Sequence, residues 1–153
     1  MRKVVLGLGI SLDGYIARPD GSVDFLFMPK DYSMVPFFAT IDVAVMGRKT
    51  LDAGLKMGGG SFNGYGLMSY VLSRSQPAGK RDGYSVTRQT PERLIRQLRE
   101  QPGKDIWLMG GGELARDFLR PTWSTNSISA SYRCCSVKAS RFSRAAFRSA
   151  TSN

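Results

Sequence analysis

The sequence of 153 residues contains no histidine. This absence excludes histidine-based acid–base catalysis, the Ser-His-Asp triad and most zinc sites. The two cysteines, Cys134 and Cys135, are adjacent, so they indicate neither a disulfide framework nor a spaced metal site. No apolar run approaches the roughly 18 residues of a membrane span, and the first residues lack a signal-peptide cleavage site. We therefore expect a cytoplasmic protein with no metal and no membrane partner.

Acidic residues are missing from the end of the chain. The formal net charge is +10, and half of it comes from residues 121–153, which hold five basic and no acidic side chains. This stretch is also rich in serine and shows no sustained alternation of apolar and polar residues. Its composition predicts a basic, poorly ordered tail over residues 120–153. A nucleic-acid-binding module is one alternative, but the rest of the chain has no recognisable groove-reading element, so nucleic acid is not the expected partner.

Residues 1–119 alternate between strand-like and helix-like patterns. Apolar, β-rich runs predict strands at residues 3–10, 42–46, 70–72, 84–86 and 106–109. Helical spacing predicts a short helix near 34–40, another after residue 50, one from Pro91 with Thr90 as its N-cap, and one at 114–119. Residues 76–83 are typical of a turn. Such alternation predicts an α/β domain with a mostly parallel central sheet flanked by helices.

Three of the predicted strands end in glycine, hydroxyl or basic residues. Ligands of open α/β sheets bind beyond the carboxyl ends of the strands, so neighbouring ends of this kind suit a polyanionic dinucleotide. A single cation is more often a solvated surface charge, and a glycine run can be a plain turn, but the repetition favours a site. The residues are Gly47, Arg48, Lys49 and Thr50; Ser73, Arg74 and Ser75; and Gly110, Gly111, Gly112 and Glu113.

The ordered set VAVMGRKT (43–50), VLSRS (71–75) and IWLMGGGE (106–113) resembles the dihydrofolate-reductase-like superfamily. Within it, ISLDGYI (10–16) is similar to the reductase domain of bifunctional riboflavin-biosynthesis deaminase/reductase enzymes and to its small standalone relatives. The resemblance covers about residues 3–119. It implies the sheet of that superfamily and a small-molecule substrate. It leaves open whether the chain forms a homodimer.

The resemblance further implies an NADPH-dependent reductase that transfers hydride to a C=N or C=O carbon of a small heterocyclic or ribosylamino-pyrimidine-like substrate. By position, residues 47–50 and 73–75 would hold the pyrophosphate and 2′-phosphate side of NADPH, and residues 110–113 would pass under the pyrophosphate and nicotinamide ribose. Asp13 and Asp24 are candidate proton donors, although Asp13-Gly14 is also an ordinary turn pair. The Trp-x-x-Pro-x-Asp signature of true dihydrofolate reductases is missing from residues 18–35, which argues against folate.

The resemblance stops after residue 119, where a complete family member should continue with a closing antiparallel strand pair. Read one base upstream, the genetic code permits Ala-Asp-Leu-Val-Asp-Glu over residues 121–126. The same shift permits Val-Pro-Val-Leu-Leu-Gly-Glu-Gly over 132–139 and Ile-Pro-Leu-Phe-Pro over 140–144. These are acid-containing, strand-like segments similar to the family's closing strands. We therefore hypothesise that the tail is translated out of frame and that closing strands are missing, which leaves a catalytically inactive relative as a further alternative.

Overall fold

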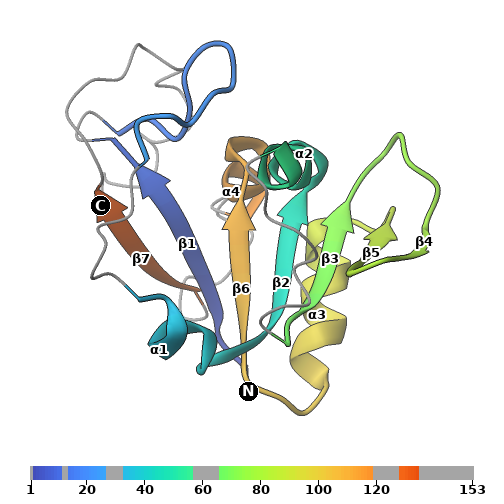
Figure 1. The fold of residues 1–153 in the computed structure, drawn as a ribbon. Coiled ribbons are helices and arrows are strands. Elements are labelled where there is room, and N and C mark those ends of the chain that lie inside the picture. The colour runs from blue at the N-terminus through green and yellow to red at the C-terminus, as the bar shows by residue number, and fades with distance from the viewer. Residues whose placement is uncertain (1, 12–13, 27–32, 57–65, 119–127, 135–153) are drawn as a thin grey trace.

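A computed structural model describes residues 2–11, 14–26, 33–56, 66–118 and 128–134 of the chain (Figure 1). Within these residues the elements in chain order are β1 (Val4–Ile10), α1 (Val35–Phe38), β2 (Ile41–Gly47), α2 (Arg48–Lys56), β3 (Met68–Leu72), β4 (Gly79–Arg81), β5 (Tyr84–Thr87), α3 (Pro91–Glu100), β6 (Asp105–Gly110), α4 (Gly112–Phe118) and β7 (Ile128–Cys134). In the described part of the chain, no helix is long and apolar enough to cross a membrane.

The strands form one sheet in the order β4-β5-β3-β2-β6-β1-β7. All neighbouring strands run parallel except β4 and β5, which form an antiparallel pair. Apart from Asp42 and Asp105 near their starts, the interior strands β2 and β6 are apolar throughout, as expected of parallel strands covered on both faces. The predicted α/β fold with a mostly parallel sheet is therefore confirmed.

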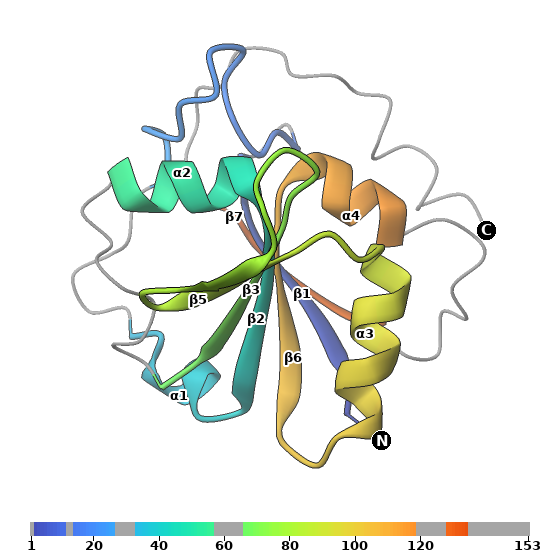
Figure 2. The ribbon, with the colours of Figure 1, turned by 90° about the vertical axis from the view of Figure 1, so that its right-hand side faces the viewer.

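Helices cover both faces of the sheet (Figure 2), with α3 and α4 on one face and α1 and α2 on the other. Each face carries its own apolar core because side chains alternate between the two sides of a strand. The core under α3 and α4 consists of Val4, Leu6, Val43, Val45, Leu94, Ile95, Leu98, Ile106, Leu108, Leu114, Ala115 and Phe118. The opposite core consists of Ile41, Ala44, Met46, Leu51, Leu67 and Val71, with Phe37, Phe38, Tyr84, Trp107 and Met109 packed against it.

The start of α3 follows the sequence signal closely. The Thr90 hydroxyl accepts a hydrogen bond from the backbone N–H of Arg93 at 3.3 Å, and Pro91 occupies the first helical position. This cap satisfies one of the free N–H groups of the first turn. Leu94, Ile95 and Leu98 are buried on one face of the helix, as their spacing predicts.

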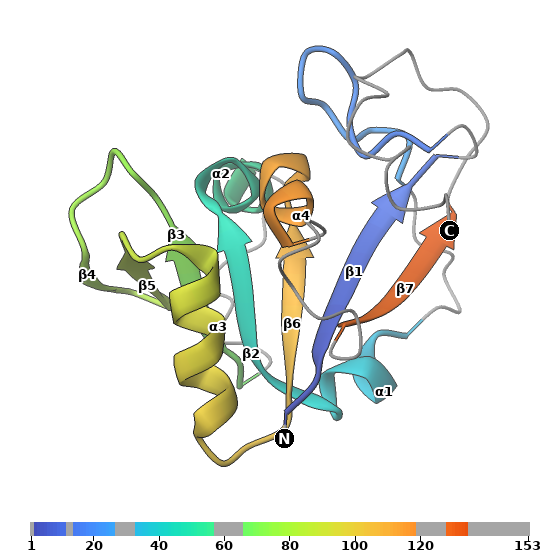
Figure 3. The same ribbon diagram turned by 180° about the vertical axis from the view of Figure 1, so that it is seen from behind.

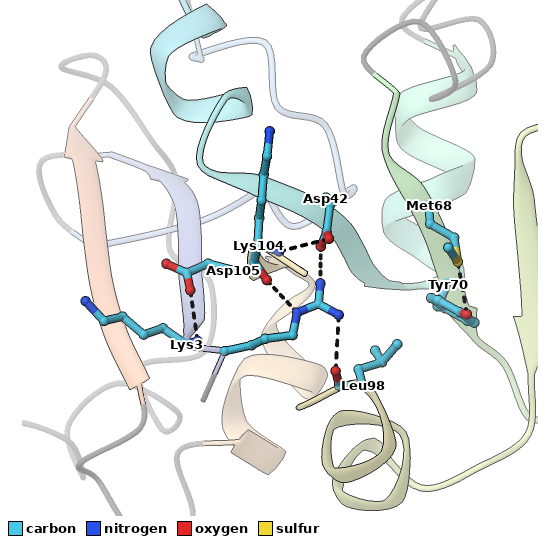
Figure 4. A network of polar contacts seen from close by, with 8 residues as sticks. Lys3, Asp42, Met68, Tyr70, Leu98, Lys104 and Asp105 are labelled. Atoms are coloured by element: carbon cyan, nitrogen blue, oxygen red, sulfur yellow. Dashed lines mark hydrogen bonds and ion pairs between the residues drawn. The ribbon is translucent and has the colours of Figure 1, made fainter. Parts of the chain in front are cut away.

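A buried arginine joins four elements at the amino ends of the strands (Figure 4). The Arg2 side chain is 5% exposed and forms an ion pair with Asp42 at the start of β2. It also donates to the carbonyl oxygens of Leu98, at 3.1 Å, and Lys104. The second carboxylate oxygen of Asp42 accepts from the Lys104 N–H at 2.9 Å. This network connects the beginnings of β1, β2 and β6 to the last turn of α3.

The β4–β5 hairpin differs from the sequence expectation. Residues 76–83 are typical of a turn, but Gly79–Arg81 forms β4 and pairs with β5, with Lys80 opposite Ser85. All three residues of β4 are exposed. A short edge strand of this kind buries no side chain, so its sequence shows no apolar alternation, and positive charges along it discourage pairing with another chain.

The second difference lies at the other edge of the sheet. Ile128–Cys134, inside the stretch whose composition predicts a tail without closing strands, forms β7 and pairs with β1 from Val4↔Ile128 to Ile10↔Cys134. The pairing is parallel, and the described residues include no antiparallel partner of β1. The sequence of this segment, ISASYRC, alternates apolar and polar residues, which is the local signal of a strand. The serine-rich, basic composition of the whole stretch hides this short signal. Residues 120–127 and 135–153 of the proposed tail lie outside the described residues.

Candidate functional site

The three predicted strand ends lie along one edge of the sheet, the one formed by the carboxyl ends of its parallel strands. Their strands β3, β2 and β6 are consecutive neighbours and parallel, so their carboxyl ends point the same way (Figure 1). Met46 of β2 pairs with Val71 of β3 on one side and with Gly110 of β6 on the other. The condition that these ends be neighbours is therefore met, and Figure 3 shows α2 and α4 starting side by side at this edge.

Direct contacts join the ends of β2 and β6. The Thr50 hydroxyl donates a hydrogen bond to the carbonyl oxygen of Gly110 at 3.2 Å. The Lys49 ammonium lies 3.7 Å from a carboxylate oxygen of Glu113, with both side chains largely exposed. Helix α2 begins at Arg48, so Arg48, Lys49 and Thr50 lie in its first turn and their side chains start from a rigid element.

Arg48 is also paired with a carboxylate. Its Nη1 lies 2.9 Å from Asp52 Oδ2, one helical turn away. Asp52 was not among the predicted site residues, although an acid four positions after a base on a helix is a recognisable signal for such a pair. In the described chain, Arg74 makes no ion pair, which leaves it as a cation at this edge with its charge uncommitted.

The loop after β3 is held together by its own polar groups. Ser73 is buried, and its hydroxyl accepts from the Gln76 N–H at 3.1 Å and lies 3.5 Å from the Ser75 hydroxyl. Arg88, which follows β5, donates from Nε to the Gln76 carbonyl at 3.1 Å. Sequence reasoning did not single out Arg88, because only the pairing of β5 with β3 brings it to this loop.

The glycines at the two central strand ends differ in what they do. Gly110 and Gly111 have φ of +96° and +85°, a region that other residues rarely adopt, so they shape the turn into α4. No described residue lies within 4 Å of a Cβ placed at Gly47, so among these residues the backbone at the end of β2 borders open space. Bare backbone beside open space is what close approach by a ligand requires.

The structure describes one of the two candidate proton donors, Asp24. Asp24 forms an ion pair with Arg18, and this hydrogen bond holds the pKa of Asp24 below its usual value. The guanidinium of Arg18 also lies 5.8 Å from the centre of the Phe25 ring. A carboxylate kept ionised in this way is a poor proton donor near neutral pH. Asp13 lies outside the described residues.

Comparisons with known proteins supply relatives for this arrangement, although no protein-family model matches the chain. YwjB of Bacillus subtilis strain 168 is 31% identical over 122 residues, which cover 78% of this chain and 70% of YwjB. The chain belongs to the YwjB family. YyaP of the same bacterium is 29% identical over 128 residues, which cover 77% of this chain and 68% of YyaP. Both YwjB and YyaP are described as uncharacterized proteins.

A solved structure extends the YwjB family likeness to the fold. A candidate riboflavin biosynthesis protein from Shewanella sp. PV-4 superposes with a TM-score of 0.63 and 26% sequence identity. The match covers 78% of this chain and 71% of that protein. The chain therefore shares its α/β fold with this riboflavin biosynthesis protein.

Proposed function

We propose that this YwjB-family chain is an NADPH-dependent reductase of the dihydrofolate-reductase and riboflavin-biosynthesis reductase type. Its substrate would be a small heterocyclic or ribosylamino-pyrimidine-like molecule with a reducible C=N or C=O bond. The observation that carries the proposal is the meeting of three strand ends at the edge where ligands of parallel sheets bind, two of which are joined by the hydrogen bond from Thr50 to Gly110.

The residues at this edge fit a dinucleotide in their chemistry. The open space beside Gly47 leaves room for a phosphate against the backbone, and the first turn of α2 adds partial positive charge there. Arg48, Lys49 and Arg74 would supply full positive charges, and Ser73, Ser75 and Thr50 would supply hydroxyl groups. The turn from Gly110 to Glu113 would lie under the pyrophosphate and the nicotinamide ribose.

The cofactor, when bound, would supply the hydride, so the protein's contribution is to bind, orient and exclude water. Two cations from α2 and one from the loop after β3 would fix the phosphate end. The backbone of β6 and its glycine turn would then set the distance between the nicotinamide ring and the sheet. Since the hydrogen bond from Arg18 lowers the pKa of Asp24, whereas a proton donor near neutral pH needs a raised pKa, we do not assign the proton delivery to Asp24.

Titration of the purified chain with NADPH, followed by the cofactor's fluorescence, tests the proposal. We expect saturable binding, weakened about tenfold or more by Arg74→Ala, because a charge-assisted hydrogen bond contributes about 1.5–3 kcal/mol. Arg48→Ala should also weaken it. Arg96→Ala, which removes an exposed cation from α3, is the matched control and should bind like the unchanged chain.

Binding without turnover of any reducible substrate would identify a catalytically inactive relative that keeps the cofactor site. Absence of NADPH binding would contradict the proposal. Equal losses of affinity in Arg74→Ala and Arg96→Ala would also contradict it, since a general effect of net charge would then explain the binding.

A further inference from the structure

Two of the three cations at the candidate site already hold carboxylates. Arg48 is paired with Asp52 at 2.9 Å and Lys49 with Glu113 at 3.7 Å. A phosphate arriving at the first turn of α2 would meet two cations that each have a negative partner. Its oxygens would have to share or displace those carboxylates.

The two pairs differ in where they lie. Arg48 and Asp52 belong to one helix, so their pair runs along α2. Lys49 and Glu113 come from neighbouring strand ends, so their pair spans the approach between β2 and β6. Both of its side chains are open to solvent, at 82% for Lys49 and 75% for Glu113, so an incoming ligand can reach them without any movement of the fold.

We propose that Asp52 and Glu113 are built-in competing anions that set how tightly a phosphate-bearing ligand binds at this edge. The proposal rests on the site of the proposed function, but it concerns the acids around that site and not the identity of the ligand. Glu113, which the sequence suggested as a cofactor-binding residue, then weakens binding through its charge. Because its ion pair links the ends of β2 and β6, Glu113 is the carboxylate chosen for the test.

The weakness of the two ion pairs allows a phosphate to replace a carboxylate as the partner of the cation. Exposed pairs of this kind are weak, so a pyrophosphate with at least two negative charges can replace a single carboxylate as the partner of Lys49. Removal of the competing carboxylate should tighten binding up to about fivefold, because the ligand then no longer has to replace the exposed ion pair of Lys49. The effect should shrink as salt is added, because the groups are exposed.

The test is a double-mutant cycle with two probes, NADPH followed by fluorescence and inorganic pyrophosphate followed by calorimetry. The variants are Glu113→Gln, Lys49→Met and their combination. Glu92→Gln, which removes an equal charge from the first turn of α3, is the matched control. We expect Glu113→Gln to bind both probes more tightly, Glu92→Gln to bind as before, and the gain from Glu113→Gln to vanish when Lys49 is absent.

The outcomes separate this proposal from the proposed function. Tighter pyrophosphate binding by Glu113→Gln, without NADPH binding by any variant, supports the competing anions and contradicts the reductase assignment. NADPH binding that is unchanged in Glu113→Gln, equally tightened in Glu92→Gln, or still tightened without Lys49 overturns the competing anions and leaves the reductase assignment standing. Binding of neither probe by any variant overturns both.

Discussion

Leu8 of β1 fills the space that a side chain at residue 110 would need: a Cβ at Gly110 would overlap with Leu8 Cδ2. Gly110 also has φ of +96°. Gly110→Ala therefore combines backbone strain with overpacking, and we expect a loss of about 2–4 kcal/mol of unfolding free energy. Urea denaturation monitored by circular dichroism measures it.

Gly47→Ala is the matched comparison for Gly110→Ala. The backbone of Gly47 is not in the left-handed region, and no residue of the described ranges lies within 4 Å of a Cβ there. We expect little change in stability but weaker NADPH binding, because the methyl group would project into the space proposed for the phosphates. A Gly47→Ala variant that unfolds as easily as Gly110→Ala would show that the end of β2 is packed and not open.

Removal of the Arg2 guanidinium should destabilise the fold. Arg2→Met would leave the carbonyl oxygens of Leu98 and Lys104 without this donor and Asp42 without its cation. We expect a loss of about 2–4 kcal/mol in chemical denaturation, since buried groups deprived of their partners bear the full desolvation penalty. Arg93→Met, an exposed cation on α3, should cost less than about 0.5 kcal/mol.

The Arg18–Asp24 pair gives a pH-dependent prediction. Because the hydrogen bond from Arg18 lowers the folded-state pKa of Asp24, the pair contributes stability above the unfolded pKa of about 4. That contribution is lost as the pH falls through the folded-state pKa. In Arg18→Gln, carboxyl NMR titration should show the pKa of Asp24 rising toward its usual value.

Asp20 serves as the internal control in that titration. Its pKa is lowered chiefly by hydrogen bonds from Ser22, with Arg18 as the smallest cause. The pKa of Asp20 should therefore stay low in Arg18→Gln. Equal upward shifts of Asp20 and Asp24 would point to a rearranged loop in place of a lost ion pair.

The packing of Trp107 against Gly7, on the sheet face covered by α1, can be tested by enlarging one side chain and reducing the other. The indole Nε1 donates to the Gly7 carbonyl at 3.4 Å, and the Trp107 ring meets Phe37 edge-on with centroids 5.2 Å apart. A Cβ at Gly7 would lie 2.6 Å from Nε1. Gly7→Ala should cost about 1–3 kcal/mol in urea denaturation, and part of that loss should be recovered by Trp107→Phe.

Failure of Trp107→Phe to recover any stability would indicate that Gly7 is required for its backbone and not for the space it leaves to the indole.

The reading-frame hypothesis predicts a single-base insertion or deletion near the codons for Arg120 and Pro121. Sequencing the coding DNA decides it, and the absence of any single change that restores the permitted reading would refute it. If the hypothesis is correct, the restored chain should unfold at a higher temperature, because additional apolar segments would cover the β1 side of the sheet.

The sequence predicted those parts of the fold in which burial leaves a periodic pattern. Strand β6 and helix α3 are apolar on the sides that face the cores, so their positions and the mostly parallel sheet could be anticipated. Strand β4 buries nothing, so no pattern signals it. The seven residues of β7 do alternate between apolar and polar, but the serine-rich, basic composition of the surrounding stretch outweighed that short signal. Their pairing is fixed by the geometry of the neighbouring strands, which a local pattern does not report.

The candidate site was anticipated to a similar degree. Glycine, hydroxyl and cationic residues at three strand ends are visible in the sequence, and the strand order β3-β2-β6 brings them together. The pairing of Lys49 with Glu113 and the hydrogen bond from Arg88 to the Gln76 carbonyl depend on tertiary contacts. Such contacts join residues far apart in the chain, so sequence spacing gave no sign of them.

The position of β1 has a consequence for synthesis of the chain. Both of its neighbours, β6 and β7, come from the last third of the sequence, and the Lys3 N–H finds its acceptor on Asp105, 102 residues away. At about 5–20 residues per second, a ribosome would leave this first apolar strand unpaired for roughly 5–20 s. The nascent chain would therefore expose VVLGLGI to chaperones, and to other copies of itself, until nearly all of the domain has emerged.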